Sequence, residues 1–157
     1  MKIAEMTVYS VGTGGRPWEI FVQLLRNQDI RLVADVRSRP VSSVPHFRQT
    51  ELRDALLGID LQYIFLGKEL GGYQRGGYET HMATKTFAAG MDRLESLAQS
   101  ARTAFLCAET LPWKCHRWHI ATELENRGWQ VLHLISPGKV WNRSQVSEEN
   151  LLWTTEP

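Results

Sequence analysis

Short, nearly continuous apolar runs alternate with helical patterns along this chain, and this alternation limits its fold more than any other feature. The predicted strands cover residues 7–11, 30–36, 61–66, 103–107 and 129–135. Predicted helices start after Pro17, at residue 51 with Thr50 as the N-cap, at residue 86 and at Cys115. Strands that alternate with helices imply right-handed crossovers and a mostly parallel sheet. We therefore predict an α/β fold, a single-domain three-layer sandwich with about five mostly parallel strands.

Length and composition narrow the class of protein. The 157 residues fit one domain, with a core over about residues 7–136 and a polar, aromatic tail over residues 137–157. Apolar residues make up 43%, which is too many for a disordered chain. The net charge of +1 favours neither a broad nucleic-acid surface nor an anionic membrane. The chain has two cysteines, no apolar leader at its start and no segment with the apolar length of a membrane span. It is therefore expected in the reducing cytoplasm, away from membranes.

Four polar or glycine-rich clusters follow the predicted strands. They are residues 12–15, Asp35 with Arg37, residues 67–72, and Cys107 with Glu109. In open parallel sheets, ligands bind outside the carboxyl ends of the strands. We therefore expect these clusters to form one pocket at that edge of the sheet.

A cysteine motif forms the centre of the predicted pocket. Cys107 ends a strand, and Cys115 begins the helix predicted for residues 115–127. Helix N-termini and neighbouring cations stabilise thiolates, and His116 and Arg117 follow Cys115 directly. We predict Cys115 as the nucleophile, with Cys107 as its competitor. Glu109 or His116 is the predicted acid or base.

Two alternatives for this motif stay open. Both cysteines can be structural, since buried cysteine is common in protein cores. A metal is the second alternative, with Cys107, Glu109, Cys115 and His116 as ligands. The chain has no C-x-x-C pair, and adjacent helical residues such as Cys115 and His116 point apart. We therefore predict no cofactor.

The remaining predicted site residues bind the substrate. They are Asp35, Arg37, His46, Gly71, Gly72, Tyr78 and Arg117. Arg37 or Arg117 is expected to bind an anion, although Arg37 can instead form a buried ion pair with Asp35. Aromatic and basic residues alternate in the glycine-rich loop 67–78, as in sites that stack and neutralise nucleotides. For residues 12–15, a tight turn is favoured over a phosphate cradle because the spacing matches neither G-x-G-x-x-G nor a P-loop.

Three separated motifs occur in an order that resembles a known family. The first comprises Asp35, Val36, Arg37, Pro40, Ser43, Pro45 and Phe47, and the second is residues 66–72. The third comprises Cys107, Ala108, Glu109, Pro112, Cys115, His116, Arg117, Ile120 and Ala121, continued by Gly128, Val131 and His133. Over residues 7–135 the chain resembles domain-of-unknown-function family 488. The resemblance implies an α/β fold and a site built from these motifs, but no reaction. Gly12-Thr13-Gly14 departs from the Gly-Tyr-Ser or Gly-His-Ser common in that family.

These inferences predict a small cytoplasmic enzyme. Its cysteine-centred pocket would act on an anionic, nucleotide-like substrate. The alternative from another class is a module that binds a nucleotide or the end of a nucleic acid, with structural cysteines. A metal-binding protein, with the ligands named above, is the third hypothesis.

Overall fold

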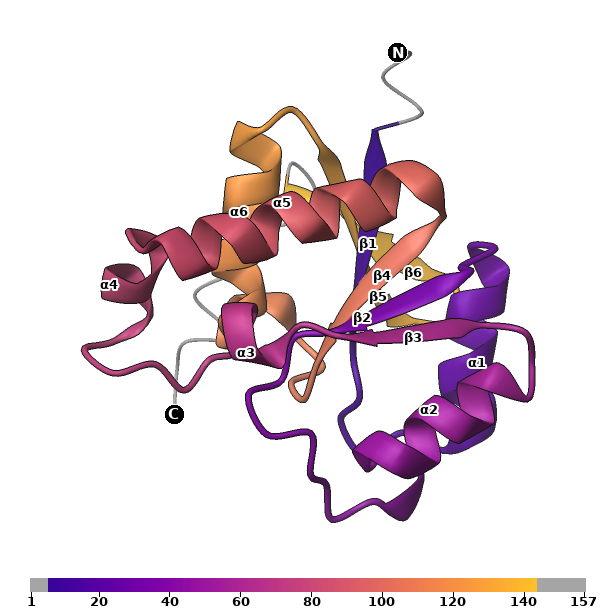
Figure 1. The fold of residues 1–157 in the computed structure, drawn as a ribbon. Coiled ribbons are helices and arrows are strands. Elements are labelled where there is room, and N and C mark those ends of the chain that lie inside the picture. Colours follow the sequence, from indigo (N-terminus) through magenta and orange to yellow (C-terminus); the bar gives the residue numbers. More distant parts are fainter. Residues whose placement is uncertain (1–5, 144–157) are drawn as a thin grey trace.

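Six strands pair into one sheet in the computed structural model, which describes residues 6–143 (Figure 1). They are β1 (Thr7–Gly12), β2 (Leu32–Asp35), β3 (Gln62–Phe65), β4 (Thr103–Cys107), β5 (Gln130–Ser136) and β6 (Lys139–Trp141). The strand order is β3-β2-β4-β1-β5-β6, and only β6 runs antiparallel to its neighbour. The prediction of a mostly parallel α/β sheet is confirmed.

The sixth strand, β6, lies within the segment predicted as a tail from residue 137 and corrects that part of the prediction. Ser136 pairs with Lys139, so Pro137 and Gly138 form a two-residue hairpin turn. Gly138 has a φ of 82°, a conformation that glycine adopts without a steric penalty. The Pro-Gly dipeptide is a turn signal that the tail prediction did not use. The rest of the predicted tail, residues 144–157, lies outside the described residues.

Helices cover both faces of the sheet, as the three-layer prediction requires (Figure 1). One layer holds α1 (Trp18–Asn27), the 3₁₀ turn η2 (Pro45–Phe47) and α2 (Gln49–Leu57). The other holds α3 (Gly67–Leu70), α4 (Tyr78–Met82), α5 (Lys85–Ser100), the 3₁₀ turn η3 (Pro112–Lys114) and α6 (Arg117–Asn126). No helix of residues 6–143 has the length and apolar character that a membrane crossing needs.

Strand alternation sends neighbouring site residues into different layers. Asp35 pairs in register with Leu106, whose side chain belongs to the core under α1 and α2. Cys107 is the next residue along β4, and its side chain belongs to the core under α5 and α6. Because successive side chains of a strand point to opposite faces, Asp35 and Cys107 lie on opposite sides of the sheet.

Two helix starts differ from the prediction. Thr50 does not cap α2, which begins at Gln49 with Arg48 at the N-cap and no side-chain cap. The helix predicted from Cys115 begins instead at Arg117. The reason is η3, which leaves Cys115 in an extended conformation with φ −147° and ψ 174°.

Residues 67–84, which include the predicted glycine-rich loop 67–78, contain two short helices. Both α3 and α4 lie beside α5 (Figure 1). Gly90 of α5 allows this approach, since a Cβ there would lie 2.6 Å from the Cβ of Glu69. Tertiary packing therefore orders a segment whose glycines predicted a loop.

Candidate functional site

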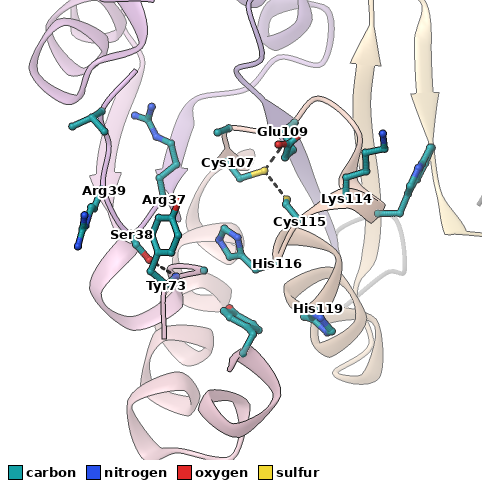
Figure 2. Close-up of a pocket in the computed structure, with 15 residues that line it drawn as sticks. Arg37, Ser38, Arg39, Tyr73, Cys107, Glu109, Lys114, Cys115, His116 and His119 are labelled. Carbon is teal, nitrogen blue, oxygen red and sulfur yellow. Dashed lines mark hydrogen bonds between the residues drawn. The ribbon is translucent and has the colours of Figure 1, made fainter. Parts of the chain in front are cut away.

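A cavity of about 970 Å³ opens at the carboxyl ends of β2 and β4 (Figure 2). It is lined by Arg37, Ser38, Arg39, Val41, Gly72, Tyr73, Tyr78, Cys107, Ala108, Glu109, Trp113, Lys114, Cys115, His116 and His119. The predicted clusters after β2 and β4, together with the glycine-rich loop, therefore contribute to one pocket.

Two free thiols face each other in this pocket. The Sγ atoms of Cys107 and Cys115 lie 2.8 Å apart (Figure 2). Cys107 is buried at the end of β4, while Cys115 is half-buried. Although α6 begins two residues later, the backbone N–H of Arg117 still donates to the Cys115 Sγ at 3.3 Å. The N-terminus of α6 therefore stabilises a thiolate at Cys115. The sequence predicted the same effect from a helix that starts at Cys115.

Arg117 is a buried cation without a carboxylate partner among residues 6–143. Its side chain is fully buried, and Nη2 donates to the carbonyl of Thr110 at 2.9 Å. Its Nε and Nη1 atoms have no hydrogen-bond partner within the described chain, and none of the ion pairs found there includes it. A buried charge is costly unless another charge compensates it. The charge of Arg117 lowers the pKa of both Cys107 and Cys115 and so favours their ionisation.

The two thiols respond to this environment in opposite directions. Burial alone would raise the pKa of Cys107, but the hydrogen bond with Cys115 and the charge of Arg117 outweigh it and lower the pKa to about 7. The hydrogen bond with Cys107, followed by burial, raises the pKa of Cys115 above its ordinary value. Interacting acids lose their protons in separate steps. The pair therefore gives up one proton near neutral pH and keeps the other.

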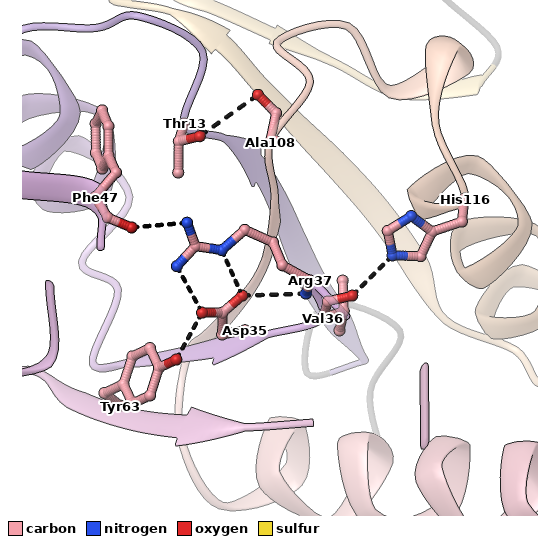
Figure 3. Close-up of polar contacts among 8 residues, drawn as sticks. All are labelled: Thr13, Asp35, Val36, Arg37, Phe47, Tyr63, Ala108 and His116. Atoms are coloured by element: carbon pink, nitrogen blue, oxygen red, sulfur yellow. Dashed lines mark hydrogen bonds and ion pairs between the residues drawn. The ribbon is translucent and has the colours of Figure 1, made fainter. Parts of the chain in front are cut away.

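His116 is held as a neutral base. Its Nε2 lies 2.8 Å from the carbonyl oxygen of Val36 (Figure 3). Since a carbonyl only accepts, Nε2 carries the proton and Nδ1 is left as an acceptor. A Cβ on Gly72 would lie 2.8 Å from Nδ1, so this glycine leaves the acceptor uncovered. Burial, the largest influence, lowers the pKa of His116 and keeps the imidazole neutral.

Asp35 and Arg37 form the buried ion pair that the sequence left as an alternative (Figure 3). Arg37 donates from Nε and Nη2 to the two carboxylate oxygens at 2.9 and 2.8 Å, and from Nη1 to the carbonyl of Phe47 at 2.7 Å. The hydroxyl of Tyr63, a residue outside the predicted site, donates to Asp35 at 2.6 Å. Arg37 therefore shapes a wall of the pocket, and Asp35 is not among the lining residues.

The other predicted substrate-binding residues lie at different distances from the pocket. Gly72 and Tyr78 line it, whereas Gly71 packs against Ser38. His46 does not line it, because its Nε2 donates to the carbonyl of Arg16 at 2.9 Å within the α1 and α2 layer. The side chain of Arg117 lies beneath the lining and influences the pocket through its charge.

Glu109 lines the pocket with an exposed side chain. Its contact with Cys107 runs through its backbone carbonyl, which lies 3.6 Å from the Cys107 Sγ. Within residues 6–143 its carboxylate pairs with neither Arg37 nor Arg117. Glu109 is therefore the acid that solvent and a bound ligand can reach.

His119 was missed by the sequence reasoning. It lines the pocket three residues after His116, and its ring stacks on the ring of Tyr78 with the two centroids 5.5 Å apart. The spacing of three residues on one helix face was the available signal.

The predicted metal alternative requires Cys107, Glu109, Cys115 and His116 to act as ligands together. In the part of the chain that the structure describes, no group of three or more His, Cys, Asp or Glu side chains is arranged to hold a metal ion. The Nε2 of His116 is already bonded to Val36. Within residues 6–143, the four predicted ligands are therefore not brought together as a metal site.

Gly12 positions the loop that carries Glu109. A Cβ at Gly12 would lie 1.8 Å from the Glu109 carbonyl oxygen, so this close approach requires glycine. Thr13 and Gly14 donate their N–H groups to the carbonyls of Cys107 and Ala108 at 2.9 and 2.8 Å. These bonds bind β1 to the end of β4 and leave neither N–H for a phosphate.

Gly12→Ala is expected to lower the free energy of unfolding by about 2–3 kcal/mol, because backbone must move to admit the methyl group. Gly15→Ala is the matched control, since a Cβ there meets nothing within 4 Å. We expect the control to stay within about 0.5 kcal/mol of the parent in urea unfolding. Equal midpoints for the two variants would contradict this role of Gly12.

Comparison with known proteins identifies the family but no activity. No curated protein and no solved structure matches the chain. The model of the family described as "Domain of unknown function DUF488" matches residues 17–124, which include β2, β3, β4 and both cysteines. The match covers more than half of the chain and includes the first two motifs of the resemblance and residues 107–121 of the third. The chain therefore belongs to the DUF488 family.

Proposed function

We propose that this protein is an enzyme that uses a thiolate on a small anionic substrate, with Cys115 as the nucleophile. One observation carries the proposal: two sulfur atoms lie 2.8 Å apart and share the influence of a buried arginine that has no carboxylate partner among residues 6–143. A structural pair of cysteines has no need of such a cation. A reactive pair does, because the cation stabilises the thiolate.

Access favours Cys115 over Cys107 for the attack. Cys107 is 1% exposed, while Cys115 is half-buried and lines the pocket. The pKa directions place the first negative charge on Cys107, and either sulfur can be the donor in the hydrogen bond between them. Transfer of the remaining proton from Cys115 to Cys107 moves the charge to the accessible Cys115. The N–H of Arg117 then donates to the ionised Cys115 Sγ. Two free thiols of this kind fit a reducing cytoplasm.

His116 and Glu109 are the proposed acid and base. The uncovered Nδ1 of His116 accepts a proton from the substrate, and burial keeps this imidazole neutral and ready to accept. The carboxylate of Glu109 lies on the solvent side of the sulfur pair. It exchanges protons with solvent or with a leaving group.

An anionic substrate fits the charges at the pocket mouth. Arg39 and Lys114 are exposed on opposite sides of it, and Glu109 is the single carboxylate among the lining residues (Figure 2). Tyr73 is 81% exposed, with the Arg39 guanidinium 5.9 Å from its ring centroid. An exposed aromatic ring beside a cation suits the stacking of a base next to a phosphate, which supports a nucleotide-like substrate.

The test compares alkylation of Cys115 by neutral iodoacetamide and anionic iodoacetate across pH, with mass spectrometry to locate the adduct. We expect the iodoacetamide rate to rise with an apparent pKa near 7, where the pair loses its first proton. The ratio of the iodoacetate rate to the iodoacetamide rate should be several-fold higher for Cys115 than for free cysteine, because the cations at the pocket mouth attract the anionic reagent. Arg39→Met/Lys114→Met should remove this preference and leave the iodoacetamide rate unchanged.

Two outcomes would contradict the proposal. An apparent pKa near the ordinary thiol value of 9.0 would show that the pair is not activated. It would favour the binding module, for which the exposed Tyr73 is the supporting observation. An unchanged reagent preference in the double variant would end the argument for an anionic substrate.

A further inference from the structure

We infer that Cys107 and Cys115 form a disulfide reversibly by exchange with a small disulfide, and that Arg117 favours the dithiol form. This activity rests on the same activated pair as the proposed function, and a small disulfide is its oxidising co-substrate. It assigns a two-thiol redox centre to the floor of the pocket.

The two sulfur atoms need to move only a short distance to form a disulfide. A disulfide bond is about 2.05 Å long, and the two sulfur atoms already lie 2.8 Å apart as free thiols. Cys115 follows a short 3₁₀ turn and precedes α6, so it belongs to neither a strand nor a helix. A small shift of this connection brings the sulfur atoms to bonding distance without breaking the sheet or α6.

The accessible and buried sulfurs have separate roles in the exchange. The Cys115 thiolate attacks one sulfur of the small disulfide, a mixed disulfide forms, and one small thiolate leaves. The Cys107 thiol gives up its proton and attacks the Cys115 sulfur. The second small thiol then leaves with that proton, and the Cys107–Cys115 disulfide forms. The pair loses two electrons, and the small disulfide is reduced to two thiols.

Arg117 sets the direction of this equilibrium. The reduced pair carries a negative charge that compensates the buried guanidinium, whereas the disulfide is neutral. Oxidation therefore leaves Arg117 with an uncompensated charge inside the protein, where charge is costly. Stabilisation of a thiolate in the reduced form makes a disulfide more oxidising. The pair is accordingly expected to be an oxidant that the glutathione pool reduces readily.

The experiment equilibrates the full chain with mixtures of glutathione and glutathione disulfide at pH 8, followed by acid quenching and mass spectrometry. We expect the parent to form the internal disulfide without a lasting glutathione adduct. Cys107→Ser should hold a stable mixed disulfide at Cys115, because the resolving thiol is gone. Arg117→Met should shift the equilibrium constant towards the disulfide by up to about tenfold at this pH.

The inference and the proposed function can fail separately. A parent protein that stays a dithiol at the most oxidising ratio, or that accumulates the glutathione adduct, overturns the redox centre. The alkylation profile of Cys115 is unaffected by either result. If the parent forms the disulfide but Arg117→Met leaves its equilibrium constant unchanged, the part assigned to Arg117 is overturned. Circular dichroism of each variant confirms that the comparison is between folded proteins.

Discussion

Arg117→Met is expected to slow alkylation of Cys115 at pH 7 by about 10- to 50-fold. The charge of Arg117 favours ionisation of both thiols, and its removal moves the first ionisation of the pair towards the ordinary thiol value of 9.0. At pH 7 a thiol with that pKa is ionised to only about 1%. At pH 10 the parent and the variant should react at similar rates, because both are then ionised.

The same substitution should leave the fold intact. Replacing a buried charge with an apolar side chain of similar volume is often neutral or stabilising. The lost bond to the Thr110 carbonyl costs about 1 kcal/mol, so we expect the free energy of unfolding to change by less than about 2 kcal/mol. Slow alkylation of a variant that is still stably folded would show that Arg117 acts on the reactivity of the thiols and not on folding.

Arg53→Met is the matched control for this prediction. Arg53 lies on α2 with its side chain 49% exposed, in the layer opposite the sulfur pair. Its removal takes away the same formal charge at a distance, where solvent screens it. An equal loss of reactivity in both variants, or an unshifted alkylation profile in Arg117→Met, would refute the local role of Arg117.

Asp35→Ala is expected to lower the free energy of unfolding by about 3–5 kcal/mol. The substitution leaves the Arg37 guanidinium buried without its counter-charge and removes the acceptor of the Tyr63 hydroxyl. Unfolding in urea measures this effect. Adding Arg37→Met should recover part of the loss, because the double variant no longer buries an unpaired charge.

Asp54→Ala is the surface control, since its ion pair with Arg53 is exposed and contributes little. Asp35 lies on the opposite face of the sheet from Cys107. The alkylation profile of the folded Asp35→Ala protein should therefore keep its apparent pKa within a few tenths of a unit. A large shift in that profile would mean that Asp35 belongs to the reactive site.

Local patterns were enough to predict the framework of this protein. The apolar runs of β1, β2, β4 and β5 are recognisable because buried parallel strands tolerate few polar residues. They placed the polar motifs at one edge of the sheet, where the pocket is found. The short β6 escaped prediction, because three residues carry too little periodicity to identify a strand.

Local sequence patterns could not predict which side chains enter the site or which partners they bind. His46 and Asp35 occur in motifs that reach the pocket edge, yet both side chains lie in the α1 and α2 layer. The proton position on His116 depends on Val36, which is 80 residues away in sequence. Such partners are selected by strand register and packing, and no local spacing specifies them.

By itself, the sequence determined the α/β class, the family and the approximate location of the pocket, because periodicity and strand-end motifs are local properties of the chain. Only the tertiary structure decided that the two thiols lie in contact and that a fully buried Arg117 accompanies them. The physical reason is that ionisation depends on burial and on neighbouring charge, and both arise only when β4, η3 and α6 pack together.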